Sequence, residues 1–197
     1  MGKISGNEAL QLLVEGNKRF SQGNFAVKDM GAARRENLST KGQEPFAVVV
    51  TCSDSRVPPE LLFDQALGDI FVVRTAGNVV DAIAIGSVEY AVEHLETPLV
   101  VVLGHEKCGA VKATVDGGEA PGSISAIVSK IVPSVQKAQA AGIKGSDLYE
   151  AACRENIGAT IADLEKSPIV KHFIKDGLLK VVGAKYYLGS GEVTFYI

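Results

Sequence analysis

The sequence has few of the residues that a secreted, membrane-spanning or nucleic-acid-binding protein would need. It contains three cysteines, an odd number that makes a poor disulfide framework. No apolar run is long enough to span a bilayer, and the first residues contain no apolar signal core. There is no run of Lys and Arg, and the net charge is −3, which argues against nucleic acid or an anionic membrane as the partner. We therefore expect a cytoplasmic protein with reduced thiols.

What the sequence does have is the composition of an ordinary globular chain. Of its 197 residues, 46% are hydrophobic and 22% are charged. It has no internal repeat and no linker that would separate two cores. We expect one domain over residues 1–197, with a helical arm at 1–40 and an α/β core at 41–197.

Apolar runs of strand length alternate with helical segments through this core. The runs at 46–51, 70–74, 99–104 and 178–187 predict strands, and 192–197 is expected to add an edge strand by a hairpin. The helical pattern favours helices at 59–65, 80–95, 108–115, 124–140, 148–164 and 169–175. This alternation indicates an α/β fold with a mostly parallel sheet and right-handed crossovers.

The N-terminal arm also carries helical signals. Ser5 and Glu8 have the spacing of a capping box, which predicts a helix from there to about residue 20. A second, short helix is expected near 32–38. In the core, Pro133 is expected to break or kink the helix over 124–140, because proline cannot donate a backbone hydrogen bond.

Two cysteines and one histidine stand where strands end. Cys52 follows the first core strand, His105 follows the third, and Cys108 comes three residues after His105. Open α/β sheets bind ligands at the carboxyl ends of their strands, so these side chains can converge. Two thiolates and one imidazole suit zinc, and three protein ligands leave a fourth position for water, as in catalytic sites. We predict one Zn²⁺ per chain.

Two charged residues beside Cys52 complete the candidate catalytic group. Two thiolates neutralise the zinc charge, so the ion alone is less able to acidify water. Ionised Asp54 can only accept hydrogen bonds, and it could orient the attacking oxygen by accepting a hydrogen bond from it. Arg56 could hold Asp54 in a charge-assisted pair and keep it off the metal. The alternative is that the pair only stabilises the turn.

The remaining cysteine and histidines have no such context. Cys153 lies in an apolar helical stretch and is expected to be a buried, unreactive thiol. His94 and His172 are expected at the surface, although either could shuttle protons. The sequence also lacks the HExxH motif of zinc peptidases and the H-x-E and P-C-x-x-C motifs of base deaminases.

Taken together, the motifs resemble those of a known family. The runs Cys-Ser-Asp-Ser-Arg at 52–56 and Gly-His-Glu-Lys-Cys-Gly at 104–109 are similar to the zinc motifs of the β-class carbonic anhydrases. Further similar segments lie at 15–20, 68–74, 76–78, 86–91 and 183–193, so the resemblance covers nearly the whole chain. It implies reversible hydration of CO2 to bicarbonate and a proton by attack of zinc-bound hydroxide.

The resemblance also implies an architecture and partners. The family fold is a four-stranded parallel sheet with an extra antiparallel edge strand, flanking helices and an N-terminal helical arm. Its members form homodimers that can pair into dimers of dimers, and the N-terminal helix reaches across to the partner subunit.

The family has two site architectures, and this chain is closer to the open, plant-like one. The other architecture has a bicarbonate site built on a tryptophan three residues before the first Cys, where this chain has Val49. Gln43, Phe71 and Tyr90 match the substrate-side residues of the open pattern and are expected from the partner chain. Phe71 could instead be core, and Tyr90 could pack a helix. The substrate site is expected to include two further residues, Ala76 and Gly77.

Two other functions stay open on the sequence alone. The same scaffold could hydrolyse carbonyl sulfide or carbon disulfide, which are linear like CO2. A non-enzymatic zinc or thiol redox sensor is the second alternative, since two thiols near a metal can respond to oxidation. The sensor has no use for the Asp54–Arg56 pair, which favours the enzyme.

Overall fold

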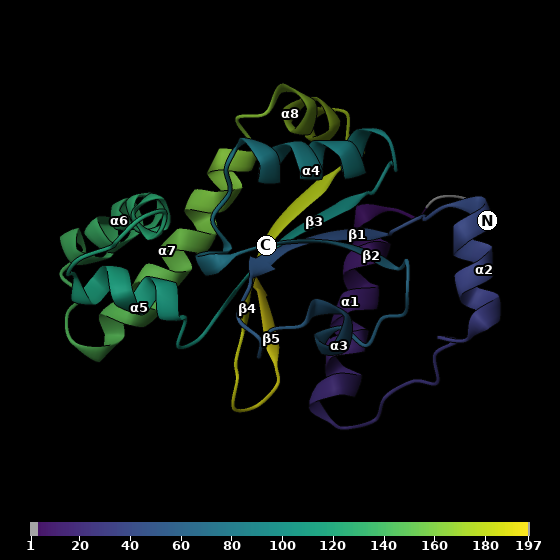
Figure 1. The fold of residues 1–197 in the computed structure, drawn as a ribbon, viewed down its shortest axis with the longest axis horizontal. Coiled ribbons are helices and arrows are strands. Elements are labelled where there is room, and N and C mark those ends of the chain that lie inside the picture. Colours follow the sequence, from purple (N-terminus) through teal and green to yellow (C-terminus); the bar gives the residue numbers. More distant parts are fainter. Residues whose placement is uncertain (1–3, 197) are drawn as a thin grey trace.

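A five-stranded sheet forms the centre of the computed structural model, which describes residues 4–196 (Figure 1). Residues 1–3 of the predicted arm, and residue 197 of the predicted last strand, lie outside the described part. The strands are β1 (Ala47–Cys52), β2 (Ile70–Thr75), β3 (Leu99–His105), β4 (Lys180–Tyr186) and β5 (Val193–Tyr196). They lie in the order β2-β1-β3-β4-β5, with β5 alone antiparallel to its neighbour. The predicted α/β fold with one antiparallel edge strand is confirmed.

The central strands are buried on both faces, which explains their continuous apolar runs. Every residue of β1 and of β3 is buried. Val48 and Val50 belong to one hydrophobic core, whereas Ala47 and Val49 belong to the other. This alternation follows from the two-residue period of a strand, and it requires helices on both faces of the sheet.

Helices cover the two faces unequally (Figure 1). One face carries α4 (Ala82–Glu93), α7 (Ser146–Leu164) and α8 (Pro168–Lys175), with α5 (Gly109–Asp116) and α6 (Ile124–Ala140) packed beside α7. The other face carries α1 (Gly6–Ser21) and the short α3 (Pro59–Leu62). Helix α2 (Ala32–Lys41) lies at the margin of the molecule, on the right in Figure 1, and buries no residue.

The first helix shows how local signals and packing agree. Ser5 caps α1, and the side chain of Glu8 accepts a hydrogen bond from the Ser5 backbone, so the predicted capping box is confirmed. Ala9, Leu10 and Leu13 are buried against the sheet of their own chain. The helix is therefore docked on this subunit.

Some predicted boundaries are wrong, for identifiable reasons. The fourth strand begins at Lys180 rather than 178, because Leu178 lies in the turn after α8 and its backbone N–H bonds to the Phe173 carbonyl. Helix α4 begins at Ala82 because the Asp81 side chain caps it.

Helix α6 runs through Pro133 without the expected break. Ile131 and Val135, on either side of the proline, are buried, and α6 packs along α7 and α5. This packing maintains the helix at the cost of one backbone hydrogen bond. Among the described residues, no helix has both the length and the apolar character needed to cross a membrane.

Candidate metal centre

The three predicted ligands meet at the point where the strand order reverses. Cys52 is the last residue of β1, and His105 is the last residue of the neighbouring β3. The chain leaves β1 for β2 on one side of the sheet, and β3 lies on the other side. Such a switch point opens a crevice at the carboxyl ends of the strands. Cys108 stands at the N-terminus of α5, close to both of the other ligands.

The three side chains have the spacing that a tetrahedral metal requires. Their candidate ligand atoms all lie within 4.8 Å of one another, and all three residues are buried. The Cys52 and Cys108 Sγ atoms are 4.0 Å apart. Two sulfurs bound to one tetrahedral zinc at ~2.3 Å would be ~3.8 Å apart. The group therefore fits a metal ion of zinc size.

The His105 ring is oriented for the same role. Its Nδ1 lies 2.9 Å from the Glu106 carbonyl oxygen, which can only accept, so Nδ1 carries the proton and donates it. Its Nε2 is fully buried and has no hydrogen-bond partner among the described residues. An unpartnered buried nitrogen is costly unless it coordinates something. Fixing the imidazole through its other nitrogen is the usual arrangement of metal-bound histidine.

The thiols of Cys52 and Cys108 differ in their pKa values. The Cys52 and Cys108 sulfurs are hydrogen-bonded to each other, and the Gly77 N–H donates to Cys52 Sγ from 3.3 Å, which stabilises this sulfur as an anion. Together they lower the pKa of Cys52 to about 4. The bond to Cys52, burial and the nearby negative charge raise the pKa of Cys108. A bound cation would remove this asymmetry, since metal binding favours both thiolates.

Asp54 and Arg56 form the predicted pair beside these ligands. The Arg56 guanidinium donates from Nε to Asp54 Oδ1 at 2.9 Å and from Nη2 to Oδ2 at 2.7 Å. The Arg56 backbone N–H also donates to Oδ1, at 2.9 Å. These bonds hold the pKa of the Asp54 carboxyl well below its usual range. Asp54 Oδ2 lies 3.9 Å from His105 Nε2, so an ionised acceptor faces the metal group.

Arg74 also supports the site, although it was not predicted from the sequence. Its Nε donates to the Cys52 carbonyl at 3.0 Å, and its Nη2 donates to the Asp54 carbonyl at 2.7 Å. It therefore fixes the backbone that carries both a ligand and the acceptor. A charged residue near the end of the otherwise apolar β2, whose register places it opposite Thr51, was the available signal.

The candidate substrate residues fall into two groups. Ala76 and Gly77 form the turn after β2, next to Cys52. Phe71 pairs in register with Val48, four residues before Cys52, which corresponds to ~13 Å along the strand.

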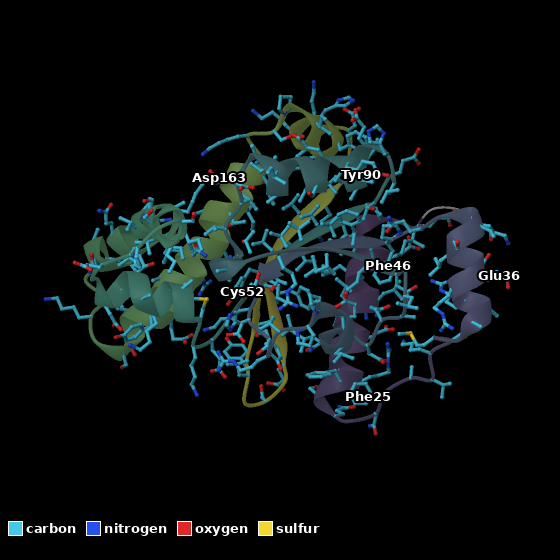
Figure 2. All side chains as sticks on the ribbon, viewed as in Figure 1. Phe25, Glu36, Phe46, Cys52, Tyr90 and Asp163 are labelled. Atoms are coloured by element: carbon cyan, nitrogen blue, oxygen red, sulfur yellow. The ribbon has the colours of Figure 1, made fainter. Side chains whose placement is uncertain are left out.

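The second group lies toward the amino end of the sheet. Tyr90, on α4, contacts Phe71 with ring centroids 6.4 Å apart. Figure 2 shows Tyr90 well away from Cys52, on the side of Phe46, which directly precedes β1. Gln43 precedes β1 altogether and is exposed. Within one chain, Gln43, Phe71 and Tyr90 do not reach the metal group.

The other sulfur and the other histidines lie outside the ligand set. Cys153 is buried, and its Sγ donates to the His105 carbonyl at 3.3 Å. Burial is the main cause that raises the pKa of the Cys153 thiol to about 12. The His94 and His172 side chains are exposed, as expected.

Comparison with known proteins gives one consistent result. The sequence profile of the carbonic anhydrase family matches residues 47–193. A carbonic anhydrase from Mycolicibacterium smegmatis is 45% identical over 190 residues, covering 94% of this chain and 90% of the relative. Carbonic anhydrase 2 from Mycobacterium tuberculosis is 41% identical over 191 residues, with the same coverage of both chains.

Solved structures agree with the sequence relatives. The β-carbonic anhydrase CcaA superposes with a TM-score of 0.76 at 30% identity, covering 95% of both chains. A β-carbonic anhydrase from Coccomyxa, solved with acetazolamide, has a TM-score of 0.71 at 30% identity and covers 94% of this chain and 85% of its own. With the Cys-His-Cys group at the sheet's switch point, these matches show that the chain belongs to the β-carbonic anhydrase family of enzymes.

Proposed function

We propose that this protein catalyses the reversible hydration of CO2 to bicarbonate and a proton, with one zinc ion per chain held by Cys52, His105 and Cys108. The main support is the buried Nε2 of His105, which has no hydrogen-bond partner among the described residues. It faces two cysteine sulfurs whose separation fits a tetrahedral metal. We also infer a cytoplasmic location, where reducing conditions keep thiols available as ligands.

Zinc bound here would supply a water of lowered pKa as the nucleophile. Asp54 then accepts a hydrogen bond from the attacking oxygen and directs its lone pair toward the carbon of CO2. It can do so because Arg56 occupies both carboxylate oxygens and keeps the group ionised. Arg56 also donates to the Lys107 carbonyl at 3.4 Å, which ties this pair to the loop that carries His105 and Cys108.

The site is of the open type, in which Asp54 stays on Arg56 and leaves the fourth position to water. The support is the bidentate pair, together with Val49 where the other architecture has tryptophan. Crystal structures of the zinc-loaded protein at neutral and at alkaline pH would test this. We expect the Asp54–Arg56 bonds in both, and coordination of zinc by Asp54 at alkaline pH would contradict the open site.

The substrate pocket is completed by a second copy of the chain. Ala76 and Gly77 lie beside Cys52 in one subunit, whereas Gln43, Phe71 and Tyr90 lie toward the opposite end of the sheet. In a homodimer, the partner would bring its own copies of the last three to the zinc. Dimers could associate further into dimers of dimers.

Two matched cysteine variants test the metal and the activity together. Cys52→Ala removes a ligand, whereas Cys153→Ala removes a buried thiol outside the ligand set. We expect Cys52→Ala to lose both zinc and CO2 hydration in a stopped-flow assay, and Cys153→Ala to retain stoichiometric zinc. Full activity of a zinc-free Cys52→Ala protein would rule out the metal mechanism. Faster turnover of carbonyl sulfide or carbon disulfide than of CO2 would assign the site to that hydrolysis instead.

A further inference from the structure

The turn after β2 places a backbone donor on one of the metal-ligand sulfurs. Gly77 adopts the left-handed conformation, with φ 73° and ψ 19°, and Asn78 follows it with φ 48°. In this conformation, the Gly77 N–H points at Cys52 Sγ, 3.3 Å away. Two successive left-handed residues are unusual, so surrounding structure must hold them.

Two buried side chains of α7 hold this turn. Asn156 Nδ2 donates to the Gly77 carbonyl at 2.7 Å, and Thr160 Oγ1 donates to the Asn78 carbonyl at 3.0 Å. Asn156 is 1% exposed and Thr160 is 3% exposed. They stand one helical turn apart, so both face the same side of α7. Both side chains therefore act on the peptide backbone beside Cys52 rather than on a candidate metal ligand.

The N–H···S bond affects how strongly a zinc ion at this site could acidify water. Two thiolates and a neutral imidazole cancel the charge of Zn²⁺, which weakens its ability to acidify water. A hydrogen bond to a thiolate draws electron density from the sulfur, so the sulfur donates less charge to the metal. The Gly77 N–H can therefore keep the zinc more electrophilic, provided that its direction is fixed.

We propose that Asn156 is a positioning residue that tunes the metal centre by holding Gly77 in the conformation that donates to Cys52. Gly77 carries both groups concerned, since its N–H reaches the sulfur and its carbonyl receives the Asn156 amide. Thr160 holds only the next peptide. This inference rests on the proposed function, because it concerns the metal that the Cys-His-Cys group would bind.

The difference between Asn156 and Thr160 provides a matched pair of variants. Asn156→Leu replaces the amide by an apolar group of similar size, and Thr160→Val does the same for the hydroxyl. Both remove one buried hydrogen bond between α7 and the same turn, so both should lower stability by comparable amounts. A purely structural role predicts the same effect of the two on the metal centre.

The first measurement is the thiolate-to-metal charge-transfer band of the protein loaded with Co²⁺. We expect Asn156→Leu to move this band to longer wavelength, because a sulfur without its hydrogen bond gives up an electron more easily. Thr160→Val should leave it at the wild-type position. Asn156→Ala, which adds no bulk, gives the same comparison if Asn156→Leu does not fold.

The second measurement is the pH profile of kcat/KM for CO2 hydration by the zinc enzyme. We expect the profile of the Asn156 variants to move to higher pH by ~0.5–1 unit, which is about a threefold to tenfold smaller ionisation constant. Folded Asn156 variants with an unshifted band and profile would overturn the proposal. An equal shift in Thr160→Val would also overturn it, because the effect would then be general loosening of the turn.

The outcomes separate this inference from the proposed function. If the wild-type protein binds Co²⁺ without a thiolate charge-transfer band, the Cys-His-Cys metal site itself is wrong. If the wild-type band is present and only the Asn156 comparison fails, the metal site stands and the role of Asn156 is wrong.

Discussion

Replacing Gly77 by alanine tests how tightly the turn beside Cys52 is built. An alanine Cβ at this position would lie 2.8 Å from Ile131 Cδ1 and 3.1 Å from Ala110 Cβ. Both distances are shorter than ordinary van der Waals contact between carbon atoms. The backbone also has φ 73°, which an L side chain rarely adopts.

The expected loss of stability is the sum of two effects. The left-handed conformation costs a residue with a side chain ~1–2 kcal/mol. Forcing a methyl group into a packed core costs a further ~1–3 kcal/mol. We therefore expect Gly77→Ala to lower the free energy of unfolding by ~2–5 kcal/mol, a large part of the ~5–15 kcal/mol of a typical protein.

Two other glycines serve as controls that separate the cost of the backbone conformation from the cost of crowding the core. Gly177 has φ 71° in the turn that ends α8, where the Leu178 N–H bonds back to the Phe173 carbonyl, and an alanine Cβ there would meet no described atom within 4 Å. Gly177→Ala should therefore lose only the ~1–2 kcal/mol of the backbone conformation. Gly158 lies inside α7 with the same open space, so Gly158→Ala should gain ~0.5–1 kcal/mol from helix propensity.

The assay is urea unfolding of all three variants at one protein and one metal concentration, because bound metal or a partner subunit adds stability by mass action. We expect Gly158→Ala to be the most stable of the three variants and Gly77→Ala the least stable. If Gly77→Ala loses no more stability than Gly177→Ala, the turn is not packed against Ile131 and Ala110 as described.

Two further predictions concern charged groups. Arg56→Gln removes the bidentate hydrogen bonds to Asp54. We expect kcat/KM for CO2 hydration to fall by ~10–100-fold, while the zinc content stays unchanged. An unaffected rate would show that Arg56 has no role in the mechanism. Asp64, whose side chain is 4% exposed, accepts a hydrogen bond from Arg19 and lies 3.5 Å from Lys28. Burial alone would raise the pKa of Asp64, but the hydrogen bonds from Arg19 and the Ala26 N–H, with the charge of Lys28, hold it below its ordinary value of 3.8. The contribution of Asp64 to folding stability is therefore complete above that pH and is lost as the pH falls through the lowered pKa. Asp64→Asn should therefore cost ~2 kcal/mol of unfolding free energy at neutral pH and progressively less in acid, and a cost that does not vary with pH would contradict the ion pair.

Local patterns predicted most of the fold because each pattern has a direct physical cause. The apolar runs that became β1 and β3 are buried on both faces, and the capping box at Ser5 forms as expected. One expected effect, a break at Pro133, does not occur, because tertiary packing overrides the local preference. Pro133 disfavours a helix interior, but burial of α6 against its neighbours keeps the helix continuous.

The candidate site was predictable in its chemistry but not in its support. Cys52, His105 and Cys108 stand out because thiol and imidazole side chains at strand ends are typical of metal sites. Arg74 and Asn156 did not stand out, because each acts on a backbone carbonyl that is distant in sequence. Such contacts exist only once β2 and α7 are packed against the end of β1.

The sequence by itself determined which residues could hold a metal, which residue could accept a hydrogen bond beside it, and that strands and helices alternate. These follow from side-chain chemistry and from the periods of local structure, which depend on neighbours in the chain. Only the tertiary structure decided that the two sulfurs lie 4.0 Å apart, that His105 Nε2 is left for a ligand, and that Gly77 donates to Cys52. It also decided that Phe71 and Tyr90 lie away from the metal group of their own chain, because the sheet order and strand register set those distances.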